Sequence, residues 1–207
     1  MADHWLVMKF GGTSVAGKAQ WQTIASLAKK RRKEGYRVLL VCSAVATVTN
    51  GLTALADQPD SSSQLAEILS LHRALSEQLG VSLDSWLPEA EQKLNESLAR
   101  LRLNPDPAAR ASLLAMGEWM STRIGVQFLG QELDAGWVDA REALEAVEEI
   151  DVSIARRWLS ADCRAGRDDR VARLWAELPA VLVTQGFIAS SAKGETVLLG
   201  RGGSDTS

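Results

Sequence analysis

The stretch VMKFGGTSV, residues 7–15, interrupts an apolar run with two adjacent glycines. Gly11 and Gly12 are poor strand residues, because glycine loses much backbone entropy on folding and has no side chain to pack. Such a pair is expected where another group must approach the bare backbone. Lys9 precedes the glycines and two hydroxyl residues, beginning with Thr13, follow them. We therefore expect this stretch to bind an anion such as phosphate.

The residues on either side of the stretch predict a strand–helix–strand unit. Residues 5–10 and 37–42 are apolar runs of strand length, and the second is apolar enough for a strand buried on both faces of a parallel sheet. Between the two runs, apolar residues recur at helical spacing as far as Gly35, which we expect to cap the helix.

The rest of the chain predicts a helical middle and a β-rich end. A short helix ends near residue 57, and QPDSSS (58–63) is the expected linker. Helices are predicted at about 64–79, 85–102 and 108–130, followed by a short strand that leads into a loop over 136–144, and from Pro179 by two β-rich runs joined by a hairpin turn.

Composition limits the function. The chain has 207 residues, 46% of them hydrophobic and 24% charged, with a net charge of -3, which argues against a nucleic-acid partner. We read the basic run KKRRKEG (29–35) as charge that complements a helix C-terminus. No apolar stretch reaches membrane-spanning length, and the N-terminus carries no signal-peptide pattern.

Cysteine and histidine are scarce. Cys42 and Cys163 are too few for a disulfide framework and fit a reducing compartment, so we expect a cytoplasmic protein. Cys42 lies in an apolar run and is expected in the core. His4 and His72 are far apart in sequence, so neither a histidine-based triad nor a metal cluster is expected. Chemistry should rest on charged side chains, hydroxyls and backbone amides.

A second glycine cluster, LLGRGGSDTS (198–207), repeats the pattern of the first. Its glycines flank Arg201, and Ser204 and Asp205 follow with side chains that suit a helix N-terminus. Glycine-rich loops before helices form anion sites, because several N–H groups converge there. Two such loops, each with a cation, indicate phosphoryl transfer, although neither matches the Walker or dinucleotide-binding pattern.

Several motifs together resemble the aspartate kinases of the amino-acid kinase superfamily. KFGGTS, SAVATVTN, GEWMS, VTQGFI and GRGGSD occur in the order expected of that family, and the resemblance covers essentially all 207 residues. It implies a three-layer α/β/α sandwich with a mainly parallel sheet. It also implies ATP-dependent phosphorylation of the β-carboxylate of L-aspartate, the first step toward lysine, threonine and methionine, by an enzyme that is a homo-oligomer at full length.

The resemblance assigns roles by position. Lys9 would contact the transferred phosphoryl group beside the amides of the glycine stretch, and Asp205 would complete the catalytic site. Glu118 would face the α-amino group of aspartate and Arg201 its α-carboxylate. The remaining residues implied at the site are Gly11, Gly12 and Thr13 for phosphate, and Ser43, Thr49, Phe187 and Ser204 for the substrate.

This chemistry is consistent without a general base. The acceptor carboxylate is already ionised at neutral pH, so catalysis reduces to positioning and to neutralising phosphoryl charge with lysine, backbone amides and Mg²⁺. ATP and Mg²⁺ are the implied cofactors, and no metal site formed by protein ligands is expected.

The sequence departs from the family in two places. Thr47 stands where the family usually has glycine, which is unfavourable if the position needs a positive φ. The chain also stops after GRGGSD, so we expect residues 1–207 to be the N-terminal, substrate-binding part of a longer polypeptide and to be inactive alone. A fusion with a second enzyme is one form that this polypeptide could take. Two alternatives remain open: another amino-acid kinase, or a catalytically incomplete fragment that binds aspartate.

Overall fold

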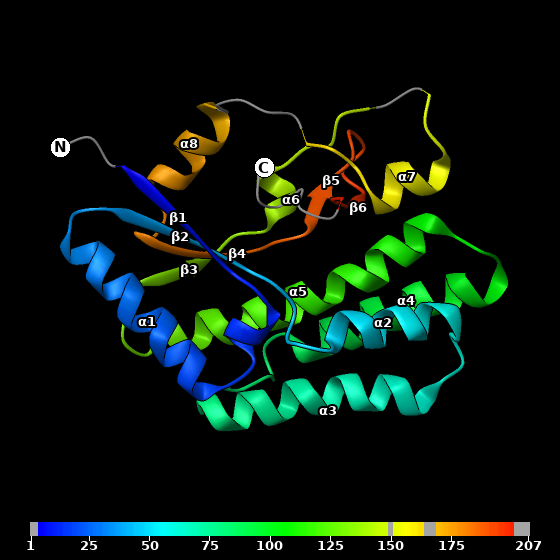
Figure 1. Ribbon diagram of the computed structural model, residues 1–207, viewed down its shortest axis with the longest axis horizontal. Coiled ribbons are helices and arrows are strands. Elements are labelled where there is room, and N and C mark those ends of the chain that lie inside the picture. Colours follow the sequence, from blue (N-terminus) through cyan, green and yellow to red (C-terminus); the bar gives the residue numbers. More distant parts are fainter. Residues whose placement is uncertain (1–3, 149–150, 164–168, 201–207) are drawn as a thin grey trace.

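The computed structural model describes residues 4–148, 151–163 and 169–200. Arg201, Ser204 and Asp205, which were predicted to bind substrate or to act in catalysis, lie outside the described residues. The N-terminal segment forms the strand–helix–strand unit that the sequence predicts (Figure 1). No helix among the described residues is both long enough and apolar enough to span a bilayer.

The centre of the fold is a parallel sheet of four strands in the order β1-β2-β4-β3. This confirms the predicted parallel sheet and both predicted N-terminal strands. The third and fourth strands are separated by a long stretch of chain, yet β4 lies between β2 and β3. The strands are β1 (Trp5–Phe10), β2 (Arg37–Cys42), β3 (Ala135–Trp137) and β4 (Val181–Gln185).

Helices cover the two faces of this sheet unequally. Helices α1 (Lys18–Lys33) and α5 (Pro107–Gly130) pack on one face, while the shorter α6 (Ala140–Ala143) and α8 (Asp169–Ala176) lie toward the other (Figure 1). The result is the expected α/β/α arrangement. The face toward α8 is less fully covered, and Val7 of β1 is 59% exposed there.

Arg37 attaches α8 to the sheet. Its guanidinium donates hydrogen bonds to the backbone carbonyls of Trp175 at 2.7 Å, Ala176 at 3.0 Å and Leu178 at 2.7 Å, which are carbonyls at and just beyond the end of α8. The same guanidinium lies 4.5 Å above the Trp5 ring, and that ring contacts Trp175 edge to face. A side chain from β2 thus donates to carbonyls of the last turn of α8 and of the segment that follows it.

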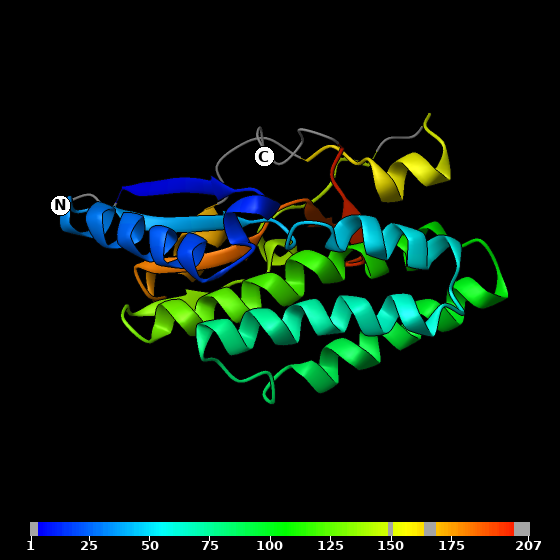
Figure 2. The ribbon, with the colours of Figure 1, turned by 60° about the horizontal axis from the view of Figure 1, so that its bottom comes forward.

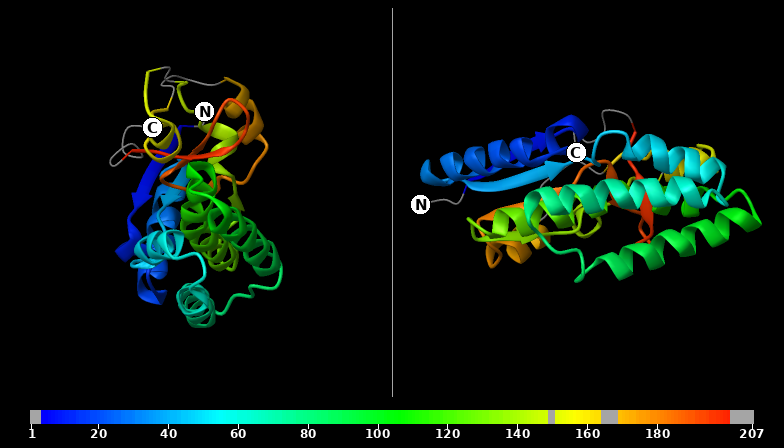
Figure 3. Two further views of the ribbon diagram at one scale, coloured as in Figure 1. Left: turned by 90° about the vertical axis from the view of Figure 1, so that its right-hand side faces the viewer. Right: turned by 90° about the horizontal axis from the view of Figure 1, so that it is seen from below.

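A layer of helices lies beyond α5, away from the sheet (Figure 2; Figure 3, right). Local capping sets where these helices begin and end. The Ser61 hydroxyl accepts from the backbone N–H of Gln64 in the helix that begins at Ser62, and Gly80 adopts φ 66° where that helix ends. The Asp106 carboxylate caps α5. The predicted helices are confirmed, with the linker shortened to residues 58–61. The layer contains α2 (Val48–Asp57), α3 (Ser62–Leu79) and α4 (Leu87–Leu103).

Two expectations for the second half of the chain are corrected in detail. The β-rich run at 180–190 is not one strand, because it divides at Gly186 and Phe187 into β4 and β5 (Ile188–Ser190), which belong to different sheets. The predicted hairpin is confirmed, since β5 pairs antiparallel with β6 (Thr196–Leu198). After β3 the chain forms the one-turn helix α6 rather than a loop, because the Asp139 carboxylate accepts from the Arg141 N–H.

The short elements between residues 152 and 178 were not predicted. Besides α8, they include α7 (Ile154–Leu159), which has a Ser153 cap and no buried residue. Cys42 is fully buried as expected, and burial raises the pKa of its thiol to about 12.

Helix α5 is buried on nearly every side, and its glycines allow the close contacts. The Trp21 ring from α1 lies against the backbone of Gly125, where a Cβ atom would be only 1.9 Å from a ring carbon. Trp21 is itself fully buried and donates its indole N–H to the Val15 carbonyl at 3.0 Å. The ring therefore cannot move aside without breaking that bond.

We expect Gly125→Ala to lower the free energy of unfolding by about 3 kcal/mol or more, the upper end for overpacked cores, because the new methyl group overlaps the Trp21 ring. Chemical denaturation measures the change. Gly130→Ala is the matched control, since nothing lies within 4 Å of its added methyl group and alanine favours a helix. Equal stabilities of the two variants would contradict the steric explanation.

Candidate active site

Three loops meet at the carboxyl edge of the sheet. In the parallel register Phe10 pairs with Cys42, and Cys42 pairs with Gln185, so the segments after β1, β2 and β4 leave the sheet side by side. Backbone bonds join them: the Ser43 N–H donates to the Phe10 carbonyl and the Gly186 N–H to the Cys42 carbonyl, both at 3.0 Å. Ligands of open α/β sheets bind at this edge.

The glycine stretch turns from β1 into a short 3-10 helix, η1 (Gly12–Val15). Gly12 must be glycine, because a Cβ atom there would lie 2.8 Å from the Ala44 carbonyl oxygen in the loop after β2. The Ala46 N–H also donates to the Gly12 carbonyl at 3.2 Å. Gly11 has open space around it, and Thr13 is exposed. The predicted phosphate loop is therefore built against the predicted substrate loop.

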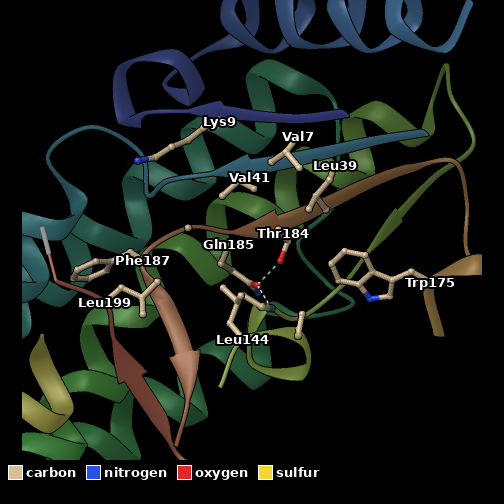
Figure 4. A pocket seen from close by; sticks show the side chains of 13 residues that line it. Val7, Lys9, Leu39, Val41, Leu144, Trp175, Thr184, Gln185, Phe187 and Leu199 are labelled. Atoms are coloured by element: carbon tan, nitrogen blue, oxygen red, sulfur yellow. Dashed lines mark hydrogen bonds between the residues drawn. The ribbon is translucent and has the colours of Figure 1, made fainter. Parts of the chain in front are cut away.

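Lys9 lies at one end of a hollow of about 420 Å³ on the incompletely covered face of the sheet, and Trp175 lies at the other (Figure 4). Most of its lining is apolar. Gln185 is its most buried polar group: its Oε1 accepts from the Ala140 N–H at 2.8 Å, and its Nε2 has no partner among the described residues. Phe187 lies beside the Lys9 end of the hollow, in the left-handed conformation with φ 70°.

Thr47 is strained. It precedes α2 with φ 76° and ψ -22°, and its side chain makes no capping hydrogen bond. A β-branched residue rarely adopts this left-handed conformation. The position thus has the positive φ that suits glycine, the residue that the resemblance to aspartate kinases implies there. Thr49, assigned above to the substrate loop, lies two residues after Thr47, in the first turn of α2.

Glu118 of α5 is a buried carboxyl group with only part of its hydrogen-bonding capacity satisfied. The residue is 3% exposed, and its carboxylate accepts from the backbone N–H of Ala44. Its Oε2 atom has no partner among the described residues. Burial raises the pKa of this carboxyl to about 7, against the lowering effect of the hydrogen bonds from Ala44 and from its own backbone N–H. A buried oxygen in this state is suited to a cationic ligand group.

The peptide group between Ser43 and Ala44 is held from both ends by α5. Its N–H donates to the Glu118 carboxylate, and its carbonyl accepts from the Ser121 hydroxyl at 2.7 Å. Gly117 makes this proximity possible, because a Cβ atom there would lie 2.8 Å from the Ala44 Cβ. The structure therefore brings Glu118 and the Ser43–Ala44 peptide together through a backbone contact that no sequence motif predicts.

The sequence did not single out Ser121 or Gln185. Ser121 was visible within the quoted GEWMS motif, three residues after the glutamate and so on the same helical face. Gln185 was visible within VTQGFI at the end of a buried strand. Of the predicted site residues that the structure describes, Lys9, Gly11, Gly12, Thr13, Ser43, Thr49, Glu118 and Phe187 all lie in or beside the three loops or on the helices that contact them.

Comparison with known proteins agrees with this geometry. The sequence profile of the amino acid kinase family matches residues 4–207, so the chain belongs to the amino acid kinase family. Lysine-sensitive aspartokinase 3 of Escherichia coli is 32% identical over 97% of this chain, and the aspartokinase of Chlamydia muridarum is 28% identical over 98%.

Solved aspartokinase structures share the fold. The chain superposes with a TM-score of 0.75 and 29% identity on E. coli aspartokinase III in complex with aspartate and ADP, and 98% of the chain is covered. Aspartate kinase from Clostridium acetobutylicum, at 16% identity, shares the fold with a TM-score of 0.65. The chain spans 44% of the length of each of the two curated relatives above and 45% of the E. coli structure.

We expect Thr47→Gly to be more stable than Thr47→Ala by about 1 kcal/mol, because only glycine relieves the left-handed strain while both changes remove the same branched side chain. Urea denaturation of the two variants and the wild type measures the difference. If the alanine variant is as stable as the glycine variant, Thr47 carries no strain.

Glu118 should make stability depend on pH. A folded-state pKa near 7, above the ordinary value of 4.5, means that the folded protein keeps a proton that the unfolded chain has lost in this range. The free energy of unfolding should therefore fall as the pH rises from 4.5 to 7, by up to about 3 kcal/mol. Glu118→Gln removes the ionisable group, so its stability relative to wild type should rise across this window.

Denaturation at pH 5, 6, 7 and 8 tests this expectation. Glu67→Gln makes the same change at an exposed glutamate of α3 and serves as the matched control. A constant difference between Glu118→Gln and wild type over this range would show that the carboxyl group is already ionised, and paired, at pH 5.

Proposed function

We propose that the site binds L-aspartate and that the polypeptide carrying it transfers a phosphoryl group from ATP to the β-carboxylate, forming 4-phospho-L-aspartate. The observation that carries this proposal is the buried Glu118 carboxyl with its unpartnered Oε2, positioned by the loop that also contacts the glycine stretch. The family assignment and the similarity to aspartokinases agree with it.

An ammonium group is the ligand chemistry that Glu118 fits best. A buried carboxylate is unfavourable unless it is paired and hydrogen-bonded, and Ala44 supplies only one N–H. A compact ammonium group would supply both the charge and further donors. The solved relative that contains aspartate and ADP supports an α-amino acid as the ligand and a nucleotide as its co-substrate.

The other substrate contacts are inferred from the family resemblance. Arg201 would bind the α-carboxylate as a planar fork, and Ser43, Phe187 and Ser204 would line the same site. Arg201 and Ser204 lie outside the described residues, so their roles rest on the sequence motif GRGGSD alone.

The transfer step needs no proton acceptor. A β-carboxylate oxygen attacks the γ-phosphorus of ATP, the bond from that phosphorus to the β,γ-bridging oxygen breaks, and ADP leaves with the electron pair. Lys9 and the amides of Gly11 and Gly12 would stabilise charge on the transferred group, with Asp205 completing the site.

Mg²⁺ would neutralise phosphate charge on the nucleotide. Within the described ranges no three His, Cys, Asp or Glu side chains are grouped so as to hold a metal ion. Mg²⁺ commonly binds through substrate phosphates and few protein ligands, so the ion would arrive with ATP.

Substrate discrimination tests the proposal. Succinate differs from aspartate only in lacking the amino group, so it leaves Glu118 buried and unpaired. We expect succinate to bind roughly 100-fold more weakly than L-aspartate, because an unpaired charged group costs about 3 kcal/mol. Isothermal titration of the chain with L-aspartate, succinate and L-glutamate measures the three dissociation constants.

The variants Glu118→Gln and Glu67→Gln test whether Glu118 recognises the ammonium group. Glu118→Gln should lose most of the preference for aspartate over succinate, whereas Glu67→Gln should retain it. Equal affinity of the wild type for aspartate and succinate would remove Glu118 from ammonium recognition. Tighter binding of glutamate than of aspartate would favour a different amino-acid kinase.

A further inference from the structure

The contact between α5 and the loop after β2 uses both ends of a single peptide group. The Ser121 hydroxyl donates to the Ser43 carbonyl at 2.7 Å, and the Ala44 N–H of the same peptide donates to the Glu118 carboxylate. Glu118 and Ser121 are three residues apart on α5 and therefore lie on one face of the helix. Rotation of this peptide would break both hydrogen bonds.

This peptide also leads into the contact with the glycine stretch. The Ala44 carbonyl faces Gly12 closely enough to exclude a side chain there, and the Ala46 N–H donates to the Gly12 carbonyl. The loop is thus held by α5 on one side and by the glycine stretch on the other. Ser121 is the side chain that joins the helix to the loop carbonyl, and it is fully buried.

We propose that Ser121 is a positioning residue of the aspartate site: by fixing the Ser43–Ala44 peptide, it keeps the Ala44 N–H on one Glu118 oxygen and directs the other oxygen toward the ligand ammonium. This inference rests on the proposed function. Ser121 does not touch the ligand, and its effect passes through the peptide and Glu118.

The geometry separates this role from helix capping or packing alone. The Ser121 hydroxyl also lies 3.2 Å from the Glu118 carbonyl within its own helix, but its shorter bond crosses to the loop. Thr122, the next residue, is equally buried, yet its hydroxyl donates only to carbonyls of α5. Of these two adjacent hydroxyls, Ser121 alone donates to the substrate loop.

The test compares two ligands in one variant. Ser121→Ala frees the peptide, so L-aspartate should bind about fivefold to tenfold more weakly, the range expected for one hydrogen bond between neutral groups. Succinate has no ammonium group to meet Glu118, so its affinity should change less than twofold. The ratio of the two dissociation constants, measured by isothermal titration of the chain, is a readout that general destabilisation would not move.

Two further variants complete the experiment. Ser76→Ala is the matched control, because this buried hydroxyl of α3 donates at 2.8 Å to the Arg73 carbonyl of its own helix. It should leave the ratio unchanged. Ser121→Cys keeps a weak donor and should give an intermediate ratio, and it replaces Ser121→Ala in the test if circular dichroism shows that the alanine variant is unfolded.

The outcomes distinguish this inference from the proposed function. If the wild type does not prefer aspartate to succinate, the proposed function fails. If the wild type has that preference and the Ser121 variants retain it in full, or lose affinity for both ligands by the same factor, Ser121 does not position Glu118. A reduced preference in Ser121→Ala with an unchanged preference in Ser76→Ala is the expected result.

Discussion

The close approach of α5 to the loop after β2 is the constraint on which the site depends. At Gly117 the helix backbone comes so near Ala44 that a single added carbon would overlap it. One residue further along α5, Glu118 can then reach a backbone N–H, and one turn further Ser121 reaches the adjoining carbonyl. The parallel register of β1 and β2 holds this loop against the glycine stretch.

The site contains a buried carboxyl group that is incompletely hydrogen-bonded and residues with a strained backbone conformation. Glu118 is buried with an unpartnered oxygen, and Thr47 and Phe187 are the non-glycine residues with positive φ in the described part of the chain. Backbone strain and incompletely paired buried groups tend to gather at binding sites, where surrounding packing maintains them. Here the sheet and helix α5 provide that packing, and the strained residues lie in the segments that follow β2 and β4.

The two faces of the sheet have different roles. One face is covered by α1 and α5 and forms the core, with Trp21 packed against Gly125. The other carries the apolar hollow at whose end Lys9 lies, and it is bordered by α6 and by the α8 end that Arg37 secures. A ligand approaching Lys9 therefore meets a mainly apolar surface on one side and the glycine stretch on the other.

The sequence by itself determined the parallel sheet, the long helices and the family resemblance, because apolar periodicity, a helix-ending glycine such as Gly35 and paired glycines are local signals. It also indicated that Thr47 occupies a glycine position. It did not reveal that β4 inserts between β2 and β3, that residues 180–190 divide between two sheets, or that Ser121 holds the Ser43–Ala44 peptide. Those features depend on contacts between residues up to 140 or so positions apart, such as the pairing of Val38 with Val181, and on the hydrogen bonds of individual backbone groups. Only the tertiary structure decides them, because side-chain patterns specify which face is buried but not which distant backbone group comes to lie against it.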